Sequence, residues 1–281
     1  MAQRFLRNRN TWIAYILLAL YGYFLNILGP ITPFLHDELH LSFTISSLHF
    51  SMFAAGILVV GLWGYLVIRR TGRWLALSIG SVGLGLGTLL LVVGRSPVIT
   101  IGATFLMGCI GSLILAVVPA ALSEEHGELR AVAIAEANVI SSLSATAAPF
   151  LVGWLAGSAM GWRLALVVAA LLSIVIGVFL FRTPHSVPSA VKQTIAHNRL
   201  PLQFWWYWTM LVLSVAIEFC MIFWSADYLE RELQLPRTGA AQAVSLFLAG
   251  MIVGRFASSR LVQRFSARQV AGASTFLGNL S

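Results

Sequence analysis

One carboxylate lies deep in an apolar stretch of the sequence: Glu218, in the segment SVAIEFCMIFW (214–224). An ionised side chain at the centre of a membrane helix costs at least about 2.5–3.5 kcal/mol on insertion scales, so such residues need a function or a partner. Glu218 could bind a cationic or hydroxylated solute, or it could take up a proton, which would make the proton the coupling ion. The structural alternative is an ion pair with an arginine or lysine on a helix beyond this sequence.

Three further side chains at depth are candidates for a solute site. Asn26 falls midway along one apolar run, and His49 falls within the next. Both could line a cavity, although amides and imidazoles in membrane helices often only hydrogen-bond a neighbouring helix. Trp224 follows Glu218 by about one and a half helical turns and could wall a sugar or aromatic ligand.

A third group of candidates lies near the start of the apolar run 131–156. Glu136 is about five residues into this run, and Asn138 follows it. Either could serve a gate or an inner cavity. The alternative for Glu136 is a solvated helix end, where its carboxylate would pair with Arg130.

Motifs for catalysis or metal binding do not occur in the sequence. The glycine spacing in GSVGLGLG (80–87) lies inside an apolar run with no preceding strand, so close helix packing explains it better than a nucleotide loop. The segment EEHGELR (124–130) has no His-Glu-x-x-His spacing and no second cluster to complete a metal site. We therefore expect no enzyme, no metal and no cofactor, with the proton as the one candidate coupling ion.

The composition indicates what positions these residues. The chain has 281 residues, of which 58% are apolar and 10% are charged, whereas soluble domains are about one quarter charged. Apolar runs of about 20 residues can cross a bilayer as helices. Eight runs qualify: 12–35, 44–67, 74–94, 98–122, 131–156, 161–181, 205–229 and 239–261. A ninth run begins near residue 268. The predicted fold is all-α, a polytopic helical bundle in the lipid bilayer.

The cations predict the orientation of these spans. With the N-terminus in the cytoplasm, fourteen arginine and lysine residues fall on the cytoplasmic side and four on the other. This asymmetry follows the positive-inside rule. The net charge of +8 is thus a topology signal, and no basic patch remains to bind nucleic acid. We expect a multi-pass protein of the plasma membrane, the inner membrane in a bacterium, with a cytoplasmic N-terminus.

The sequence also repeats itself at an offset of 194 residues. SMFAAG (51–56) returns as SLFLAG (245–250), and LHDELHL (35–41) returns as LERELQL (229–235). Parallel repeats of six helices are a known transporter architecture, with the solute site between the halves. The pattern predicts a six-helix half at 1–181, a cytoplasmic central loop at 182–204 and the start of a second half at 205–281. The second half would then end near residue 375, so the sequence is expected to be C-terminally truncated.

The loops after the second and eighth spans resemble a signature of the major facilitator superfamily (MFS), Gly-x-Leu-x-Asp-Arg-x-Gly-Arg-Arg. The first copy is GYLVIRRTGRW (64–74) and the second is GRFASSRLVQRFSAR (254–268). Arg69 and Gln263 stand where the family has aspartate. The resemblance implies an MFS-type bundle and a cytoplasmic gate motif formed by Arg70, Gly72, Arg73, Arg264 and Arg268.

The function expected from these features is secondary active transport. An MFS permease would move a small solute by alternating access, as a symporter or an antiporter, and would be a monomer at full length. The alternative is a non-transporting truncated remnant or half-carrier that acts as a membrane partner or sensor. The sequence does not indicate the substrate.

Overall fold

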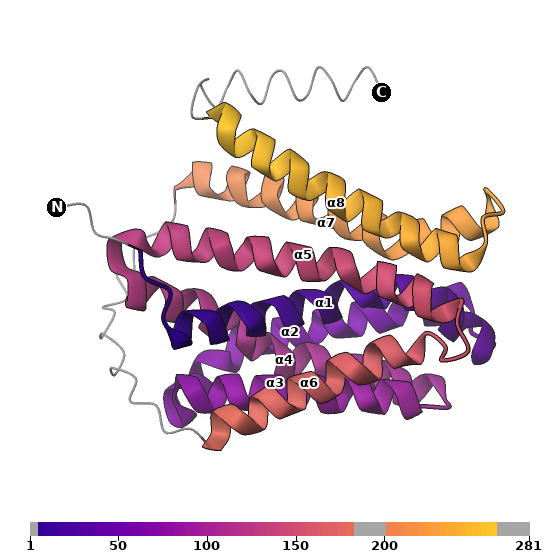
Figure 1. The fold of residues 1–281 in the computed structure, drawn as a ribbon, viewed down its shortest axis with the longest axis horizontal. Coiled ribbons are helices and arrows are strands. Elements are labelled where there is room, and N and C mark those ends of the chain that lie inside the picture. The colour runs from indigo at the N-terminus through magenta and orange to yellow at the C-terminus, as the bar shows by residue number, and fades with distance from the viewer. Residues whose placement is uncertain (1–4, 183–200, 263–281) are drawn as a thin grey trace.

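The computed structural model describes residues 5–182 and 201–262, and its regular structure in these ranges is helical (Figure 1). No strand occurs in the described part of the chain, which confirms the predicted all-α, polytopic fold class. The elements are α1 (Arg9–Glu38), α2 (Phe43–Thr71), α3 (Arg73–Val93), α4 (Pro97–His126), the 3-10 turn η1 (Gly127–Leu129), α5 (Arg130–Ala156), α6 (Arg163–Arg182), α7 (Leu202–Arg231) and α8 (Arg237–Val262).

Each predicted apolar run coincides with one of helices α1–α8, and the ends differ by a few residues. Seven helical segments are long and apolar enough to cross a membrane; one of them, Pro97–Ala156, contains both α4 and α5 because only η1 separates them. The predicted central loop falls largely between α6 and α7, at 183–200, and lies outside the described residues. The ninth run, from residue 268, also lies outside them.

Local sequence signals set several helix ends. The side-chain oxygens of Asn8, Ser42 and Ser96 accept hydrogen bonds from backbone N–H groups in the first turns of α1, α2 and α4. Such N-caps satisfy donors that have no partner within the helix. Gly72 separates α2 from α3 with a φ of 80°, a conformation that favours glycine.

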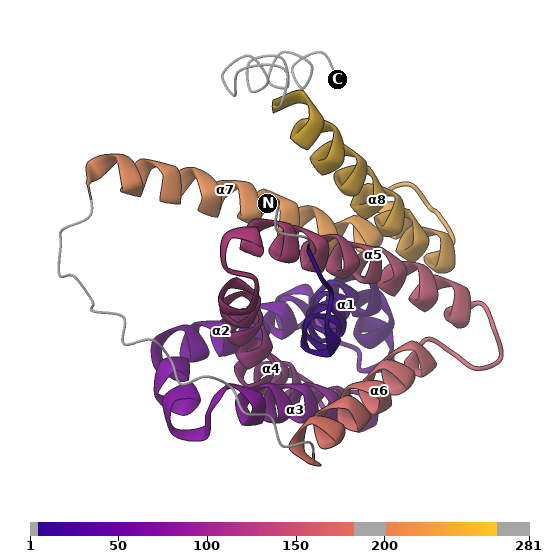
Figure 2. The same ribbon diagram turned by 60° about the vertical axis from the view of Figure 1, so that its left-hand side comes forward.

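Helix α1 lies at the centre of the bundle, and most of its side chains are buried. It packs against α5, α4 and α7, while α3 lies between α4 and α6, and α2 lies beside α4. Helix α8 packs along α5 and also contacts α7 (Figure 2). We call α1–α6 the first half and α7–α8 the second half. Contacts between the halves run chiefly through α5 with α8 and α1 with α7.

Small residues allow the helices of the first half to approach closely. A Cβ on Gly108 of α4 would lie 2.0 Å from the carbonyl oxygen of Phe53 in α2, so no larger residue fits without a shift. Between α3 and α6, the Ser81 hydroxyl donates to the Ser173 carbonyl (2.7 Å), and the Ser173 hydroxyl donates back to the Ser81 carbonyl (2.8 Å). Close backbone approach and interhelical hydrogen bonds of this kind are typical of membrane helices.

The outer surface of α2 and α7 is apolar and exposed. Leu58 and Leu62 on α2 are 69% and 73% exposed, and Trp206 and Tyr207 on α7 are 64% and 73% exposed. A soluble protein rarely leaves so many large apolar side chains in water. Together with the lengths of the helices, this surface indicates a multi-pass membrane protein.

The sequence repeat reappears in the backbone. Helices α2 and α8 begin at Phe43 and Arg237, which are 194 residues apart. In the described ranges, the non-glycine residues with positive φ are His40 (49°) and Gln234 (53°), at the same offset. The α1–α2 and α7–α8 hairpins therefore turn in the same way. We call the end of the bundle that holds these two turns the distal end, and the end where α1 begins the proximal end (Figure 1).

Candidate functional site

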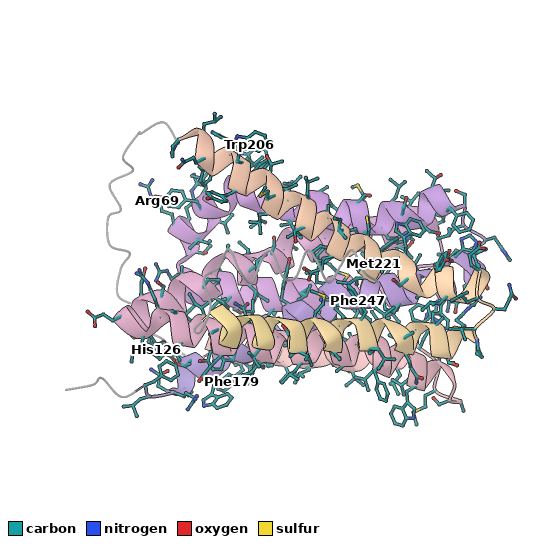
Figure 3. The ribbon with its side chains drawn as sticks, turned by 90° about the horizontal axis from the view of Figure 1, so that it is seen from above. Arg69, His126, Phe179, Trp206, Met221 and Phe247 are labelled. Carbon is teal, nitrogen blue, oxygen red and sulfur yellow. The ribbon has the colours of Figure 1, made fainter. Side chains whose placement is uncertain are left out.

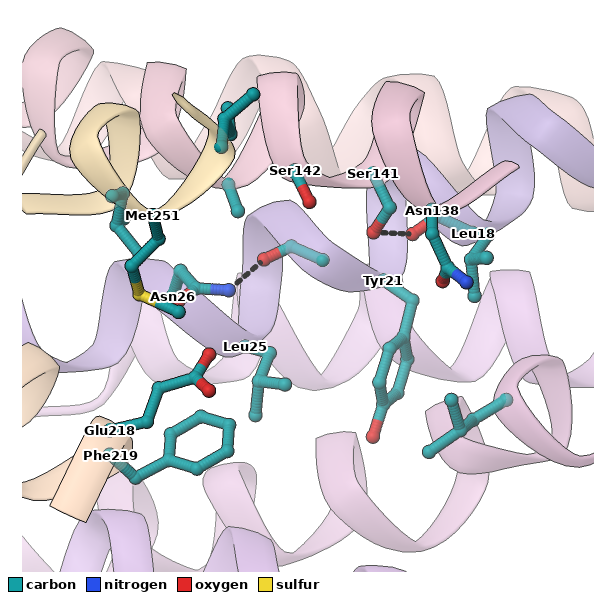
Figure 4. Close-up of a pocket in the computed structure, with 15 residues that line it drawn as sticks. Leu18, Tyr21, Leu25, Asn26, Asn138, Ser141, Ser142, Glu218, Phe219 and Met251 are labelled. Carbon is teal, nitrogen blue, oxygen red and sulfur yellow. Dashed lines mark hydrogen bonds between the residues drawn. The ribbon is translucent and has the colours of Figure 1, made fainter. Parts of the chain in front are cut away.

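A cavity of about 200 Å³ lies between the two halves, near the middle of the helices. Helices α1, α4 and α5 of the first half form one wall, and α7 and α8 of the second half form the other (Figure 4). The lining residues are Leu18, Tyr21, Gly22, Leu25, Asn26, Leu115, Asn138, Ser141, Ser142, Ala145, Glu218, Phe219, Leu248, Met251 and Ile252.

Helical periodicity places the polar lining of α5 on a single face. Asn138, Ser141, Ser142 and Ala145 stand at positions i, i+3, i+4 and i+7, which lie above one another on a helix. The resulting stripe of one amide and two hydroxyls runs along the cavity. This stripe supplies hydrogen-bonding groups to a wall that is otherwise apolar.

Hydrogen bonds orient the polar groups of the first-half wall. The Asn26 side-chain nitrogen donates to the carbonyl oxygen of Gly22 (2.8 Å), which fixes the amide one turn along α1. The Ser141 hydroxyl donates to the carbonyl oxygen of Leu18 (3.1 Å) and so ties α5 to α1. Both groups donate to a backbone carbonyl, Asn26 within its own helix and Ser141 on α1, so the acceptor oxygens of Asn26 and Ser141 have capacity for further hydrogen bonds.

The second-half wall has a different chemical character. Phe219 from α7 and Leu248, Met251 and Ile252 from α8 are apolar, and Glu218 is the charged residue in this wall. Figure 4 shows the Glu218 carboxylate directed toward Asn26 across the cavity. A ligand held here would therefore meet amides and hydroxyls on one side and an apolar surface with one carboxylate on the other.

Three of the six predicted candidates, Asn26, Asn138 and Glu218, meet in this cavity. Their side chains come from α1, α5 and α7, so a single site combines helices far apart in the sequence. The other three candidates, His49, Glu136 and Trp224, are not among its lining residues.

His49 instead joins α2 to α4. Its side chain is 3% exposed, and Nε2 lies 2.9 Å from the Thr100 hydroxyl. Nδ1 lies 3.1 Å from the carbonyl oxygen of Ser46, one turn earlier in α2. Both ring nitrogens thus have hydrogen-bond partners within the first half, which is the arrangement of a structural histidine.

Glu136 fixes the N-terminal segment to α5 at the proximal end. Its carboxylate accepts two hydrogen bonds from Arg7, one from Nε (2.8 Å) and one from Nη2 (2.6 Å), and a third from the Tyr15 hydroxyl (3.0 Å). The hydrogen bond to Glu136 raises the pKa of the Arg7 guanidinium above its usual value. The alternative of a paired helix-end carboxylate describes this geometry, but the partner is Arg7 instead of the predicted Arg130.

Trp224 lies on α7, away from the cavity face. Its side chain is 37% exposed, and its ring packs edge-on against Phe223 with a centroid distance of 5.1 Å.

Sequence reasoning missed Tyr21 as a candidate for the site, and it noted Ser141 and Ser142 only as polar residues that follow Asn138 on the same helix. The two serines carried a signal, because they follow Asn138 at helical spacing. Tyr21 carried none: its side chain is 2% exposed, and its hydroxyl has no hydrogen-bond partner in the described part of the structure. Its ring lies 6.4 Å from that of Phe53 in α2, so its place at the cavity follows from the packing of the helices.

The predicted gate motif is partly described. At the proximal end, the Arg73 guanidinium makes two hydrogen bonds to the Glu124 carboxylate and so joins the start of α3 to the end of α4. Arg70 is exposed, and Gly72 forms the turn between α2 and α3. Figure 3 shows the neighbouring Arg69 at the same end of the molecule as His126 and Trp206. Arg264 and Arg268 lie outside the described residues.

Clusters of three or more histidine, cysteine, aspartate or glutamate side chains that could hold a metal ion are absent from the described residues.

Comparisons with known proteins link this arrangement to a family. A family profile for the Major Facilitator Superfamily matches residues 14–280. No curated protein sequence matches the chain significantly.

Solved structures match over most of the chain. A bacterial homolog to the human lysosomal transporter Spinster, in an inward-facing and occupied conformation, gives a TM-score of 0.73 at 17% identity, with 95% of this chain and 63% of that chain covered. A D-xylose–proton symporter gives a TM-score of 0.68 at 13% identity, with 91% and 69% covered. At these identities the likeness concerns the fold, and this chain spans 63% of the length of the Spinster homolog.

Proposed function

Because the chain belongs to the major facilitator superfamily, whose members are transporters rather than enzymes, we propose that it carries a small solute across the membrane by alternating access. The solute would bind in the cavity between the halves. The observation that carries this proposal is that both halves contribute to that cavity: α1 and α5 on one side, α7 and α8 on the other. Movement of one half against the other would then open the same site to either side of the membrane.

The chemistry of the two walls supports a particular class of solute. Asn26, Asn138, Ser141 and Ser142 offer amides and hydroxyls, and the second-half wall offers an apolar surface beside Glu218. A small amphipathic solute with hydroxyl or amine groups on one face would satisfy both walls. Polar groups fix orientation in such sites, whereas apolar contact supplies most of the buried area.

Glu218 is our candidate for the coupling group. Its carboxylate borders the cavity on a helix of the second half, close to the solute position. A carboxylate that loses and regains a proton as the cavity changes sides would link solute movement to a proton gradient.

We propose that the proximal end of the bundle lies in the cytoplasm. Arg7 and Arg73 are at this end, together with the exposed Arg69 and Arg70. By the positive-inside rule, these cations favour a cytoplasmic location for this end. The protein would then be a monomeric carrier of a plasma membrane, the inner membrane in a bacterium.

Counterflow in proteoliposomes tests transport directly. Vesicles that contain the purified protein would be loaded with single unlabelled solutes from a panel of pentoses, hexoses, amino acids and organic amines, and uptake of the same labelled solute would be followed. We expect exchange of at least one amphipathic hydroxylated or amine solute above the rate in protein-free vesicles. Solute binding without exchange across the whole panel would contradict transport and favour a membrane partner or sensor.

Glu218→Gln tests the coupling role once a solute is known. We expect this variant to lose accumulation driven by a proton gradient while it retains solute exchange. Glu232→Gln is the matched control, because Glu232 is an exposed carboxylate at the end of the same helix. Gradient-driven accumulation that persists in Glu218→Gln would rule out the coupling role.

A further inference from the structure

Charged side chains connect the two halves at the distal end. Arg237, the first residue of α8, donates a hydrogen bond to the Asp37 carboxylate near the end of α1. It also donates to Glu230 of α7, from Nε (2.9 Å) and from Nη2 (2.6 Å) to the same carboxylate oxygen. One guanidinium therefore links a first-half helix to both helices of the second half that the structure describes.

Each of these charges stands at the unfavourable end of its own helix. A helix has a partial positive charge at its N-terminus and a partial negative charge at its C-terminus. Arg237 lies at the N-terminus of α8, whereas Asp37 and Glu230 lie in the last turns of α1 and α7. Local helix electrostatics therefore disfavours all three charges. The hydrogen bonds of Arg237 to Asp37 and Glu230 offset this unfavourable free energy.

A second contact between the halves has a matching position in the repeat. The Arg231 guanidinium lies 4.5 Å from the centre of the Phe43 ring, within the range of a cation–π interaction. Arg231 is the repeat counterpart of Asp37, and Phe43 is the counterpart of Arg237, both at the offset of 194. In both contacts, the residue at the first repeat position of one half touches the residue at the second repeat position of the other half. An approximate two-fold axis between the halves produces this arrangement.

The helices meet closely at a third repeat-related pair. A Cβ on Gly29 of α1 would lie 2.5 Å from the carbonyl oxygen of Ile222 and 2.8 Å from the Cα of Phe223 in α7. Gly29 and Phe223 are themselves 194 residues apart, so this crossing lies on the approximate axis. The glycine allows the two backbones to touch, and the distal end is closed around that point.

We propose that Asp37, Glu230 and Arg237 form a latch that holds the two halves together at the distal end and must break before that end can open. We call these three residues the distal latch. The inference rests on the proposed alternating access for its purpose, but the closure itself is a conformational property that can be measured without a transported solute.

A neighbouring ion pair provides an internal control. Glu38, next to Asp37 on α1, accepts hydrogen bonds from Arg163 at the start of α6 and from the Trp162 indole (3.1 Å). This pair lies at the same end of the bundle and has similar exposure, but both partners belong to the first half. Its loss should not change how the halves sit against each other.

The test is a distance measurement across the distal end. Spin labels would be attached at Met160→Cys in the first half and Leu233→Cys in the second half, both of which are exposed. Cys109→Ala and Cys220→Ala remove the two native cysteines of the chain. Pulsed electron paramagnetic resonance on the full chain in nanodiscs then gives the ratio of long to short distances, which reports the distal-open and distal-closed populations.

We expect Asp37→Asn to raise the ratio of open to closed molecules by up to about fivefold, the range for partly exposed ion pairs. Arg237→Gln should raise it further, because it also removes the cation–π contact of Arg237 with the Phe34 ring of α1 (5.4 Å), whereas its bonds to Glu230 lie within the second half. Adding Asp37→Asn to Arg237→Gln should change little, because the two residues act as one pair. Glu38→Gln should leave the ratio at the wild-type value.

Salt provides a second measurement that needs no latch substitution. Ions screen partly exposed charges, so raised NaCl should increase the open population of the otherwise wild-type chain and have little effect on Arg237→Gln. The proposal is overturned if Glu38→Gln opens the distal end as much as Asp37→Asn does. It is equally overturned if salt and both latch substitutions leave the distances unchanged. A distance change in a protein that exchanges no solute would support the latch and count against the transport proposal alone.

Discussion

Gly29→Ala should prevent full closure of the distal end. The added methyl carbon would lie 2.5 Å from the Ile222 carbonyl oxygen and 3.1 Å from its carbonyl carbon. Contact between nonbonded atoms is most favourable near 3.5–4.0 Å, so α7 would have to move away by about 1 Å. The atoms in the way are backbone, which cannot rotate aside as a side chain can.

The magnitude follows from the cost of overpacking. Extra methyl groups in a packed interior cost about 1–3 kcal/mol. If this strain falls on the distal-closed form alone, the ratio of open to closed molecules rises by about 5- to 150-fold. This effect should exceed that of Asp37→Asn, because steric overlap is not screened by solvent.

The spin-label pair at Met160→Cys and Leu233→Cys measures this shift. Gly61→Ala is the matched control: Gly61 lies within α2, and a Cβ there meets nothing within 4 Å. The control should keep the wild-type distances. A Gly29→Ala protein that is monodisperse and retains the wild-type ratio would refute the claim that this crossing closes the distal end.

Two further substitutions separate stability from the site. In Gly108→Ala the new Cβ would lie 2.0 Å from the Phe53 carbonyl oxygen, so this variant should destabilise the first half by about 1–3 kcal/mol and lower Tm. Gly102→Ala is the control, because its Cβ meets open space, and it should keep the wild-type Tm. Equal Tm values for the two variants would contradict the packing argument. His49→Ala should also lower stability, by about 1–3 kcal/mol, because it removes the partner of Thr100 in a buried position. Counterflow per folded molecule should stay unchanged in His49→Ala. A selective loss of exchange would instead indicate that His49 belongs to the solute site.

The helices of this protein are predictable because a bilayer imposes a simple rule on the sequence. Each span must be long and apolar, so the runs that form α1–α8 stand out from their composition alone. The repeat is predictable for a similar reason. The chain reverses in the same way at His40 and at Gln234, and similar residues surround the two turns.

The site is only partly predictable because depth in a span does not say which way a side chain faces. Glu218 and Trp224 are six residues apart, which is a rotation of about 240° around the helix. Their side chains therefore point in different directions, and of the two only Glu218 lines the cavity. His49 is as deeply buried as Asn26, yet it faces Thr100 within the first half. Packing between helices decides these directions.

Partners across long stretches of chain are the least predictable feature. The nearest cation to Glu136 in the sequence is Arg130, but the fold brings Arg7 to it from 129 residues away. Likewise, Asp37 and Arg237 are 200 residues apart and meet because the two hairpins pack together. Sequence proximity predicts ion pairs between neighbouring residues, whereas the tertiary fold can bring together any two charged residues of the chain.

The repeat-related contacts at the distal end also favour association of unlike halves. In the same two-fold arrangement, two copies of the second half would bring Arg231 against Arg237, and the like charges would repel. Two copies of the first half would set the Asp37 carboxylate near the Phe43 ring, whose face is electron-rich and repels anions. Only the unlike combination gives an ion pair and a cation–π contact at these positions. At the distal end, the differences at these two repeat positions thus favour pairing of the first half with the second half over pairing of two identical halves.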